Sequence, residues 1–239
     1  MDEPIIELHD LTKQYGKFTA VDHINLTVHK GEIFGILGPN GAGKSTTILM
    51  MLGLTDPTSG DVKVCGINST RNPIQVREKV GYLPEDVGFY DDMTGIENLL
   101  YTARLNRIDE KEARTKAQEL LERVGLPLDT KKKAGKYSRG MRQRLGLADV
   151  LIKKPEVIIL DEPTSGIDPA GVQEFRDEHG LTVLFSSHHL DQVQQICDRV
   201  GLFGAGKLLA EVNIAELQTE EHGLENMYNR YFGGGKSHE

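Results

Sequence analysis

A glycine-rich loop between two apolar segments constrains the fold of this chain more than any other feature. The loop comprises Gly38, Pro39, Asn40, Gly41, Ala42, Gly43, Lys44, Ser45 and Thr46. It follows an apolar run at 32–37 that predicts a buried strand, and it precedes a run at 46–52 that predicts a helix. Glycines allow backbone conformations that other residues disfavour, so the N–H groups of such a loop can surround a phosphate. The loop therefore predicts a nucleotide triphosphate site in an α/β fold.

Two side chains and one backbone feature indicate how the loop would hold its ligand. Lys44 supplies a cation for the β and γ phosphates, and Ser45 offers a hydroxyl to Mg²⁺. The positive end of the following helix adds to the attraction for anions. The alternative is a glycine-rich turn that merely precedes a helix, but the full motif in this context favours a phosphate loop.

The composition limits the number of domains and the kinds of partner. A chain of 239 residues suffices for one large domain, or for one domain with a small lobe, and two independent domains would fit tightly. There are 36 Asp and Glu residues against 28 Lys and Arg. Because this acidic balance repels nucleic acid and anionic membrane surfaces, we expect no nucleic-acid partner.

The sequence also predicts where the protein is located. No apolar run approaches the roughly 18 residues that cross a bilayer, and residues 1–4 lack the basic and apolar regions of a signal peptide. We therefore expect a cytoplasmic protein with no direct membrane insertion, which reaches a membrane only through a partner. Cys65 and Cys197 are far apart and have no neighbouring metal-ligand pattern, which favours reduced structural thiols.

Two kinds of strand pattern predict two sheets. Segments 5–8, 24–28 and 61–64 alternate with period two, as strands of a half-exposed antiparallel sheet do. Segments 157–160 and 182–185 are short continuous apolar runs, typical of parallel strands that are covered on both faces. The strand-helix-strand order predicts a doubly wound α/β core of the phosphate-loop type, with an N-terminal antiparallel β subdomain.

The middle of the chain predicts helices only. Segments 94–107 and 109–124 each open with the spacing of a capping box, and segment 139–152 has apolar residues at helical intervals. We therefore expect an inserted α-helical subdomain at about 87–152. The whole chain, 1–239, would form one domain. Its α/β core, including the antiparallel β subdomain, would comprise about 5–86 and 153–210, with a C-terminal extension and tail at about 211–239.

Two carboxylates end the apolar run at 157–160. Asp161 and Glu162 would lie at the carboxyl edge of a parallel sheet, where such folds bind ligands. Asp161 can hold Mg²⁺ through its waters. Glu162, one residue on, would face elsewhere and could orient or deprotonate an attacking water. The alternative for Glu162 is a solvated loop residue.

Three further residues are candidates near the same sheet edge. His188 follows the run at 182–185, and a hydrogen bond from its imidazole to the γ phosphate would report whether the triphosphate is intact. A lone histidine is more often structural, and the adjacent His189 would cap a helix or face solvent. Ser138 precedes the helix at 139–152 as an ordinary N-cap, and the same helix start can also hold an anion.

The order of these features resembles one family. The set consists of Tyr15, the loop at 38–45, Glu85, and the segments 137–143, 157–162, 165–168 and 187–188. It resembles the ATPase subunit of ATP-binding cassette (ABC) transporters over roughly residues 5–210. Within that family, segments 81–85 and 93–99 look like those of bacterial and archaeal exporters of drugs, polysaccharides or sodium.

The resemblance implies an ATP-hydrolysing, Mg²⁺-dependent subunit that works as a head-to-tail dimer. In such a dimer, Ser138 and Gly140 of one subunit complete the γ-phosphate site over Lys44 of the other. Asp168 lies in the loop that links the two sites, although helix N-capping before a proline also explains it. The second subunit would be another copy or a paralogue. Lys44, Glu162 and His188 would be the catalytic residues.

The resemblance also implies an adenine site and a membrane partner. Tyr15 would stack on the adenine, with Val21 as a second contact, whereas a tyrosine near a strand is otherwise a packing residue. An integral membrane permease would hold the protein on the inner face of the cell membrane. We expect it to dock near segment 82–100, where Phe89, Tyr90 and Met93 lie in a polar loop. Packing of these residues under the helical subdomain is the alternative.

Some positions depart from the family pattern. Glu85 replaces the usual glutamine, which leaves a Mg²⁺ or water contact possible but changes its charge. Arg139 and Met141 replace a glycine and a glutamine, and both changes look familiar from the exporter branch. Relatives also carry a longer helix before the strand at 182–185. Here only about 170–178 is expected to be helical, near the lower limit for a crossover between parallel strands.

Two other classes of protein share parts of this pattern. ABC proteins of translation or DNA maintenance usually pair two cassettes or carry long coiled-coil insertions, and neither is found here. A GTPase or small-molecule kinase would share the phosphate loop. However, there is no Asn-Lys-x-Asp guanine motif, and segment 138–143 would have no role. Competition between ATP and GTP for the purified protein separates these classes.

Overall fold

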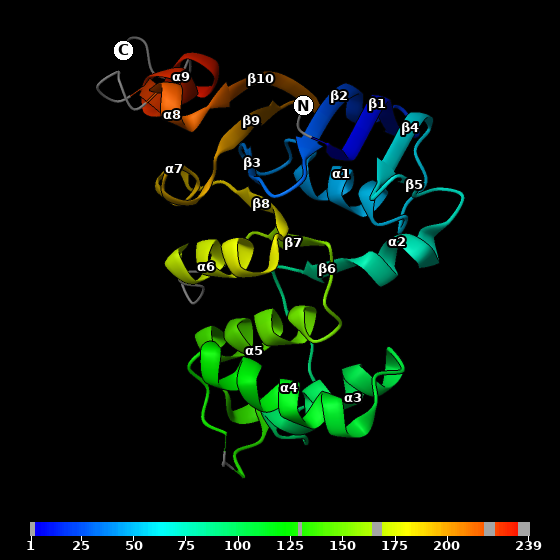
Figure 1. Cartoon of the computed structure of the whole chain (residues 1–239). Coiled ribbons are helices and arrows are strands. Elements are labelled where there is room, and N and C mark those ends of the chain that lie inside the picture. The colour runs from blue at the N-terminus through cyan, green and yellow to red at the C-terminus, as the bar shows by residue number, and fades with distance from the viewer. Residues whose placement is uncertain (1–2, 129–130, 164–168, 218–222, 234–239) are drawn as a thin grey trace.

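The computed structural model describes residues 3–128, 131–163, 169–217 and 223–233 (Figure 1). Asp168, one of the predicted site residues, lies outside these ranges. Figure 1 shows two sheets in the upper part of the molecule and a layer of helices, α3 to α5, in the lower part. Within the described residues, no helix is long and apolar enough to cross a bilayer.

The larger sheet has six strands in the order β10-β9-β3-β8-β7-β6. Its strands are β3 (Ile33–Leu37), β6 (Val80–Leu83), β7 (Val157–Asp161), β8 (Thr182–Ser187), β9 (Arg199–Gly204) and β10 (Lys207–Asn213). All neighbouring strands are parallel except β10, which is antiparallel to β9. The predicted doubly wound core is confirmed. Its topology brings the carboxyl ends of β3, β7 and β8 to one edge.

The continuous apolar runs are explained by two cores, one on each face of this sheet. In β3, Ile33 and Leu37 join the core on the side of the helical layer, whereas Phe34 and Ile36 join the core under the smaller sheet. The residues of β7 alternate in the same way. Because successive side chains of a strand point to opposite faces, a strand that is covered on both faces needs an apolar residue at every position.

The smaller sheet is antiparallel, with the order β2-β1-β4-β5. Its strands are β1 (Pro4–Tyr15), β2 (Phe18–His29), β4 (Ser59–Val64) and β5 (Ile67–Asn68). Alternate residues such as Ile6, Leu8 and Val62 are fully or almost fully buried, in the same core as Ile48 of helix α1 (Lys44–Met51). The predicted antiparallel β subdomain is therefore confirmed.

The α-helices of the helical layer, α3, α4 and α5, each begin with a side-chain cap. The helices are α3 (Gly95–Leu105), α4 (Glu110–Arg123), the short 3₁₀ helix η1 (Ala134–Lys136) and α5 (Arg139–Leu151). Thr94 and Glu97 form a reciprocal capping box on α3, and the Asp109 carboxylate accepts two backbone N–H groups at the start of α4. Ser138 accepts the N–H of Met141 at 3.3 Å. The predicted capping box is confirmed at Thr94, whereas at Asp109 only the aspartate side chain caps the helix. These caps satisfy donors that have no partner within the helix.

The connection from β7 to β8 contains one short helix, α6 (Pro169–His179). It lies between the six-stranded sheet and α5 in Figure 1. The prediction of a short crossover helix is confirmed. The remaining helices are α2 (Pro73–Lys79), α7 (Leu190–Ile196), α8 (Ile214–Leu217) and α9 (Gly223–Phe232).

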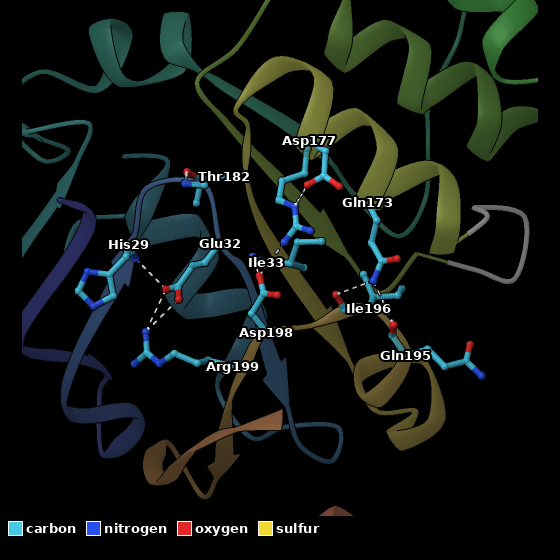
Figure 2. Close-up of polar contacts among 12 residues, drawn as sticks. His29, Glu32, Ile33, Gln173, Asp177, Thr182, Gln195, Ile196, Asp198 and Arg199 are labelled. Carbon is cyan, nitrogen blue, oxygen red and sulfur yellow. Dashed lines mark hydrogen bonds and ion pairs between the residues drawn. The ribbon is translucent and has the colours of Figure 1, made fainter. Parts of the chain in front are cut away.

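A polar network closes the amino end of the larger sheet (Figure 2). The Asp198 carboxylate accepts the N–H of Ile33 at 2.8 Å and pairs with Arg176 of α6 at 2.9 Å. Arg199 pairs with Glu32 at 3.0 Å, and the two side chains are only 25% and 12% exposed. These contacts fasten β3 to β9 and to α6 at the end of the sheet away from the glycine-rich loop.

Candidate functional site

The glycine-rich loop joins β3 to α1 and uses its glycines for two different reasons. Gly41 and Gly43 have φ values of 80° and 96°, in the left-handed region that favours glycine. A Cβ atom on Gly43 would also lie 2.6 Å from the carbonyl oxygen of Ala20, and one on Gly38 would lie 2.1 Å from that of Phe203. The loop is therefore pressed against β2 and β9, so only glycine fits at these two contacts.

Lys44 lies at the centre of this loop. Its side chain is 5% exposed, and its ammonium donates to the carbonyl oxygens of Gly38 at 2.6 Å and Pro39 at 3.3 Å. The same nitrogen lies 2.9 Å from Oε1 of Glu162. The loop thus holds its cation by its own backbone, and a carboxylate from the neighbouring sheet edge completes the surroundings of that cation.

Glu162 is held in an unusual backbone conformation at the end of β7. Its φ of 48° is left-handed, and its N–H donates to the carbonyl oxygen of Ser186 at 3.0 Å. Oε2 of the carboxylate lies 2.6 Å from Nδ1 of His188. A non-glycine residue with positive φ is strained and often marks a functional position. Glu162 therefore bridges Lys44 and His188.

The electrostatic surroundings keep Glu162 ionised. Burial by itself would raise the pKa of this carboxyl group, but the neighbouring Lys44 and then His188 hold the pKa below its ordinary value. An ionised carboxylate with a depressed pKa can accept a hydrogen bond from a water molecule at neutral pH, which is the first requirement for orienting that water.

Asp161 contacts a different set of groups, as expected for the residue before Glu162. Its Oδ2 accepts the hydroxyl of Tyr82 at 3.3 Å, and its buried Oδ1 accepts no hydrogen bond from any residue that the structure describes. Burial raises the pKa of Asp161, and the nearby hydroxyls of Ser186 and Ser45 oppose the rise. The Asp161 carboxylate and the nearby Ser45 hydroxyl offer the hard oxygen ligands that Mg²⁺ prefers.

Two hollows meet at this site. One of about 230 Å³ is lined by residues 40–46 together with Phe18, Ala20, Glu85 and Glu162. The other, of about 580 Å³, is lined by Arg139, His188 and His189 among others, and it shares Glu85 and Glu162 with the first. The main-chain oxygen of Glu85 accepts Nε2 of Gln143 at 2.9 Å, which ties the segment after β6 to α5. Glu85 and Glu162 therefore lie on the border between a phosphate-sized space and a larger opening.

The structure does not bring every predicted residue to these hollows. Tyr15 is half exposed, but it does not line the hollow at the loop, and the ammonium of Lys13 lies 5.0 Å from its ring centroid. Val21 is fully buried in the core under the antiparallel sheet. Phe18, which the sequence reasoning missed, is 63% exposed and lines the hollow. The sequence signal that could have identified Phe18 is its aromatic side chain at the start of β2, directly after the turn at Gly16.

Two predicted residues lie at the start of α5. Ser138 and Gly140 do not line the loop hollow of their own chain, whereas Arg139 between them lines the larger opening. His189 is exposed, and its ring centroid lies 4.0 Å from that of His188. The described residues therefore assemble the predicted phosphate loop, Glu162 and His188 on one subunit, with the helix start beside the larger opening.

Fold and site together define a phosphate-loop nucleotide-binding protein with an inserted helical layer. Comparison with known families agrees, because the model of the ABC transporter family matches residues 21–165. The chain therefore belongs to the ABC transporter family, and it is an ATP-binding subunit that hydrolyses ATP for transport. The predicted family and the predicted ATPase activity are confirmed.

Two curated relatives show how far the similarity extends. The chain is 46% identical over 221 residues to the bacitracin transport ATP-binding protein BcrA of Bacillus licheniformis, covering 90% of this chain and 71% of the relative. It is 38% identical over 212 residues to the linearmycin resistance ATP-binding protein LnrL of Bacillus subtilis, covering 86% and 68% of the two chains.

Solved structures share the fold over almost the whole chain. The protein cbiO1 of Clostridium perfringens, described as part of the ABC transporter complex cbiONQ, superposes with a TM-score of 0.82 at 27% identity and covers 98% of this chain and 97% of its own. The dimeric structure of MJ0796, a bacterial ABC transporter cassette, has a TM-score of 0.80 at 25% identity and covers 88% and 99%.

Proposed function

We propose that this chain powers a bacterial exporter that removes antimicrobial compounds from the cell. The observation that carries the catalytic part is the position of Glu162, whose two carboxylate oxygens lie 2.9 Å from Lys44 and 2.6 Å from His188. The export part is supported by the similarity to a bacitracin transport protein and to a linearmycin resistance protein.

Each residue of the site has a different role in ATP hydrolysis. The loop N–H groups and Lys44 bind the phosphates, and Glu162 accepts a hydrogen bond from the attacking water and orients it. His188 holds the Glu162 carboxylate in place and reaches the γ phosphate once ATP fills the loop. Ser45 and Asp161 would hold Mg²⁺, with Glu85 at the border, and this ion would neutralise charge on the β and γ phosphates.

A second cassette completes the site in this proposal. Ser138 and Gly140 face the larger opening of another subunit, which is either a copy or a paralogue, and Asp168 and Tyr15 keep their predicted roles. The dimeric structure of MJ0796 supports such pairing, because that cassette shares this fold. ATP closes the two subunits against each other, and hydrolysis opens them.

An integral membrane permease is the other proposed partner, and it holds the protein on the cytoplasmic face of the membrane. Of the candidate docking residues, Phe89 packs against the core next to the helical layer, whereas Tyr90 is exposed and contacts the ring of Tyr101 edge-on at 4.8 Å. The packing interpretation therefore fits Phe89, and Tyr90 is the residue that we assign to docking.

Susceptibility of the native host tests the proposal. Deletion of this gene is expected to lower the minimum inhibitory concentration of bacitracin or linearmycin, and expression of the wild-type chain should restore it. The Glu162→Gln variant should not restore it, although it is made at the same level. Unchanged susceptibility to both compounds would refute antimicrobial export but leave the ATPase assignment standing.

A further inference from the structure

A separate cavity of about 460 Å³ opens where the helical layer meets the core. Its apolar walls are Leu120 of α4, Leu151 of α5, Phe175 of α6 and Leu181 before β8. None of the residues that line this cavity also lines the hollow at the phosphate loop. A volume of this size is typical of small-molecule sites, which combine apolar walls with a few polar groups.

The charged groups around the cavity are mostly cationic. They are Lys30, Lys116 and Lys154, against one carboxylate, Glu156. Lys30 pairs with Glu3 at 3.9 Å. That carboxylate is engaged elsewhere, because Lys79 pairs with it at 2.6 Å. Lys154 likewise pairs with Glu112 at 2.9 Å. The positive charge at the cavity is therefore not neutralised by the carboxylate in its own lining.

Lys116 is the cation best placed to receive a ligand. It is half-buried on α4, and no carboxylate of the described residues lies within ion-pair distance of its ammonium. Burial lowers the pKa of Lys116 to about 8, and the nearby charge of Lys154 contributes, whereas the carboxylates of Glu112 and Glu119 oppose the shift. A partly desolvated ammonium without an ion-pair partner is unfavourable, so an anion in direct contact with it would be stabilising.

The wall on the α6 side is held by Arg123. Its guanidinium lies 4.3 Å from the ring centroid of Phe175 and pairs with the carboxylate of Glu178. These contacts join α6 to α4. Because the Glu178 carboxylate pairs with Arg123, it does not line the cavity. The α4 and α6 walls of the cavity are thus fastened to each other, and the cavity combines an apolar body with a cationic part.

We propose that this cavity binds a small amphiphilic carboxylate, with its headgroup at Lys116 and its apolar body against Leu120, Leu151 and Phe175. The apolar walls disfavour strongly hydrated anions such as inorganic phosphate, and a single cation without a partner suits a monoanion. The inference does not depend on the exported compound or on the dimer.

A fluorescence titration of the full chain tests the proposal. The protein contains no tryptophan, so His179→Trp places a single reporter in the cavity lining. Decanoate, kept below its micellar concentration, is expected to change the emission with a saturable dependence. Lys116→Met in this background removes the charge but keeps most of the side chain, and it should raise the half-saturation concentration about 10-fold or more.

Three controls separate a built site from adsorption. Lys111→Met on the exposed side of α4 should leave the midpoint within about twofold. Decanol and decylammonium should bind at least about 10-fold more weakly than decanoate. Ile74→Trp, a reporter at a different exposed position, should not respond at the same concentrations. The proposal is wrong if the emission of His179→Trp shows no saturable change with decanoate, or if Lys116→Met leaves the midpoint unchanged. It is also wrong if decanol or decylammonium binds as tightly as decanoate, or if the His179→Trp and Ile74→Trp reporters respond alike.

Discussion

Nδ1 of His188 lies 2.6 Å from Oε2 of Glu162, and this contact joins the carboxyl ends of β7 and β8. The second oxygen of the same carboxylate faces Lys44 of the phosphate loop. Lys44, Glu162 and His188, which follow three neighbouring strands, are therefore linked through the Glu162 carboxylate. The role of each side chain can be tested separately.

Replacing Glu162 with glutamine should slow hydrolysis while ATP still binds. The amide keeps the size of the side chain but cannot act as an anionic base, so we expect kcat to fall about 10²- to 10⁴-fold. Lys44 loses its carboxylate partner, so the affinity for ATP should be equal or higher. Phosphate release and equilibrium nucleotide binding measure the two effects. Glu156→Gln, at an ion pair away from the loop, serves as the control, and parallel loss of binding and hydrolysis in Glu162→Gln would contradict the assignment.

Removing the imidazole of His188 should reduce turnover more than removing that of His189. His188 holds the Glu162 carboxylate, and a hydrogen bond to a charged group contributes about 1.5–3 kcal/mol, equivalent to roughly 10- to 100-fold in kcat. His189 is adjacent and exposed, and its backbone N–H donates to the Ser187 hydroxyl, so within the described residues it makes no hydrogen bond with that carboxylate. Steady-state ATPase assays of His188→Ala and His189→Ala compare them directly. Equal losses in both variants would mean that the 2.6 Å contact has no catalytic role.

Alanine at Gly43 should destabilise the protein more than alanine at Gly41. Both residues have positive φ, which costs about 1–2 kcal/mol for a residue with a Cβ. A Cβ on Gly41 meets open space, whereas one on Gly43 lies 2.6 Å from the Ala20 carbonyl oxygen. Urea denaturation of the two variants measures the difference in unfolding free energy. Equal denaturation midpoints and slopes for the two variants would show that the loop can move away from β2 without a cost in unfolding free energy.

The ion pair between Glu32 and Arg199 should couple energetically, unlike the exposed pair between Glu112 and Lys154. Both members of the first pair are largely shielded, with 12% and 25% exposure, so a double-mutant cycle with Glu32→Gln and Arg199→Met should give about 1–3 kcal/mol. The second pair is 54% and 69% exposed, and its cycle should give a coupling that cannot be distinguished from zero. Equal coupling energies for the two pairs would show that shielding from solvent does not strengthen the Glu32–Arg199 ion pair.

Local features of the sequence predicted much of this fold. The capping box at Thr94 and the caps at Asp109 and Ser138 follow from residue spacing, because the bonds they form span only a few positions. The apolar runs at 157–160 and 182–185 predicted strands covered on both faces, because that coverage requires apolar residues at every position.

Contacts between distant segments were not predictable in the same way. The left-handed backbone of Glu162 is set by its bond to Ser186 and by its side-chain partners, none of which is local in sequence. Phe18 was missed because its exposure depends on how the β1–β2 turn meets the loop. Val21 has the right position along the chain, yet its direction in β2 buries it.

Lys44 is fully surrounded by oxygen atoms of its own chain, two from the loop backbone and one from Glu162. In the proposed mechanism, nucleotide binding exchanges one set of oxygen atoms for another, and only the difference between the two sets contributes to affinity. The Glu162 carboxylate would return to the ammonium when phosphate departs. An internal competitor of this kind lowers the affinity for reactant and product alike, which favours rapid repetition of the cycle over tight retention of spent nucleotide.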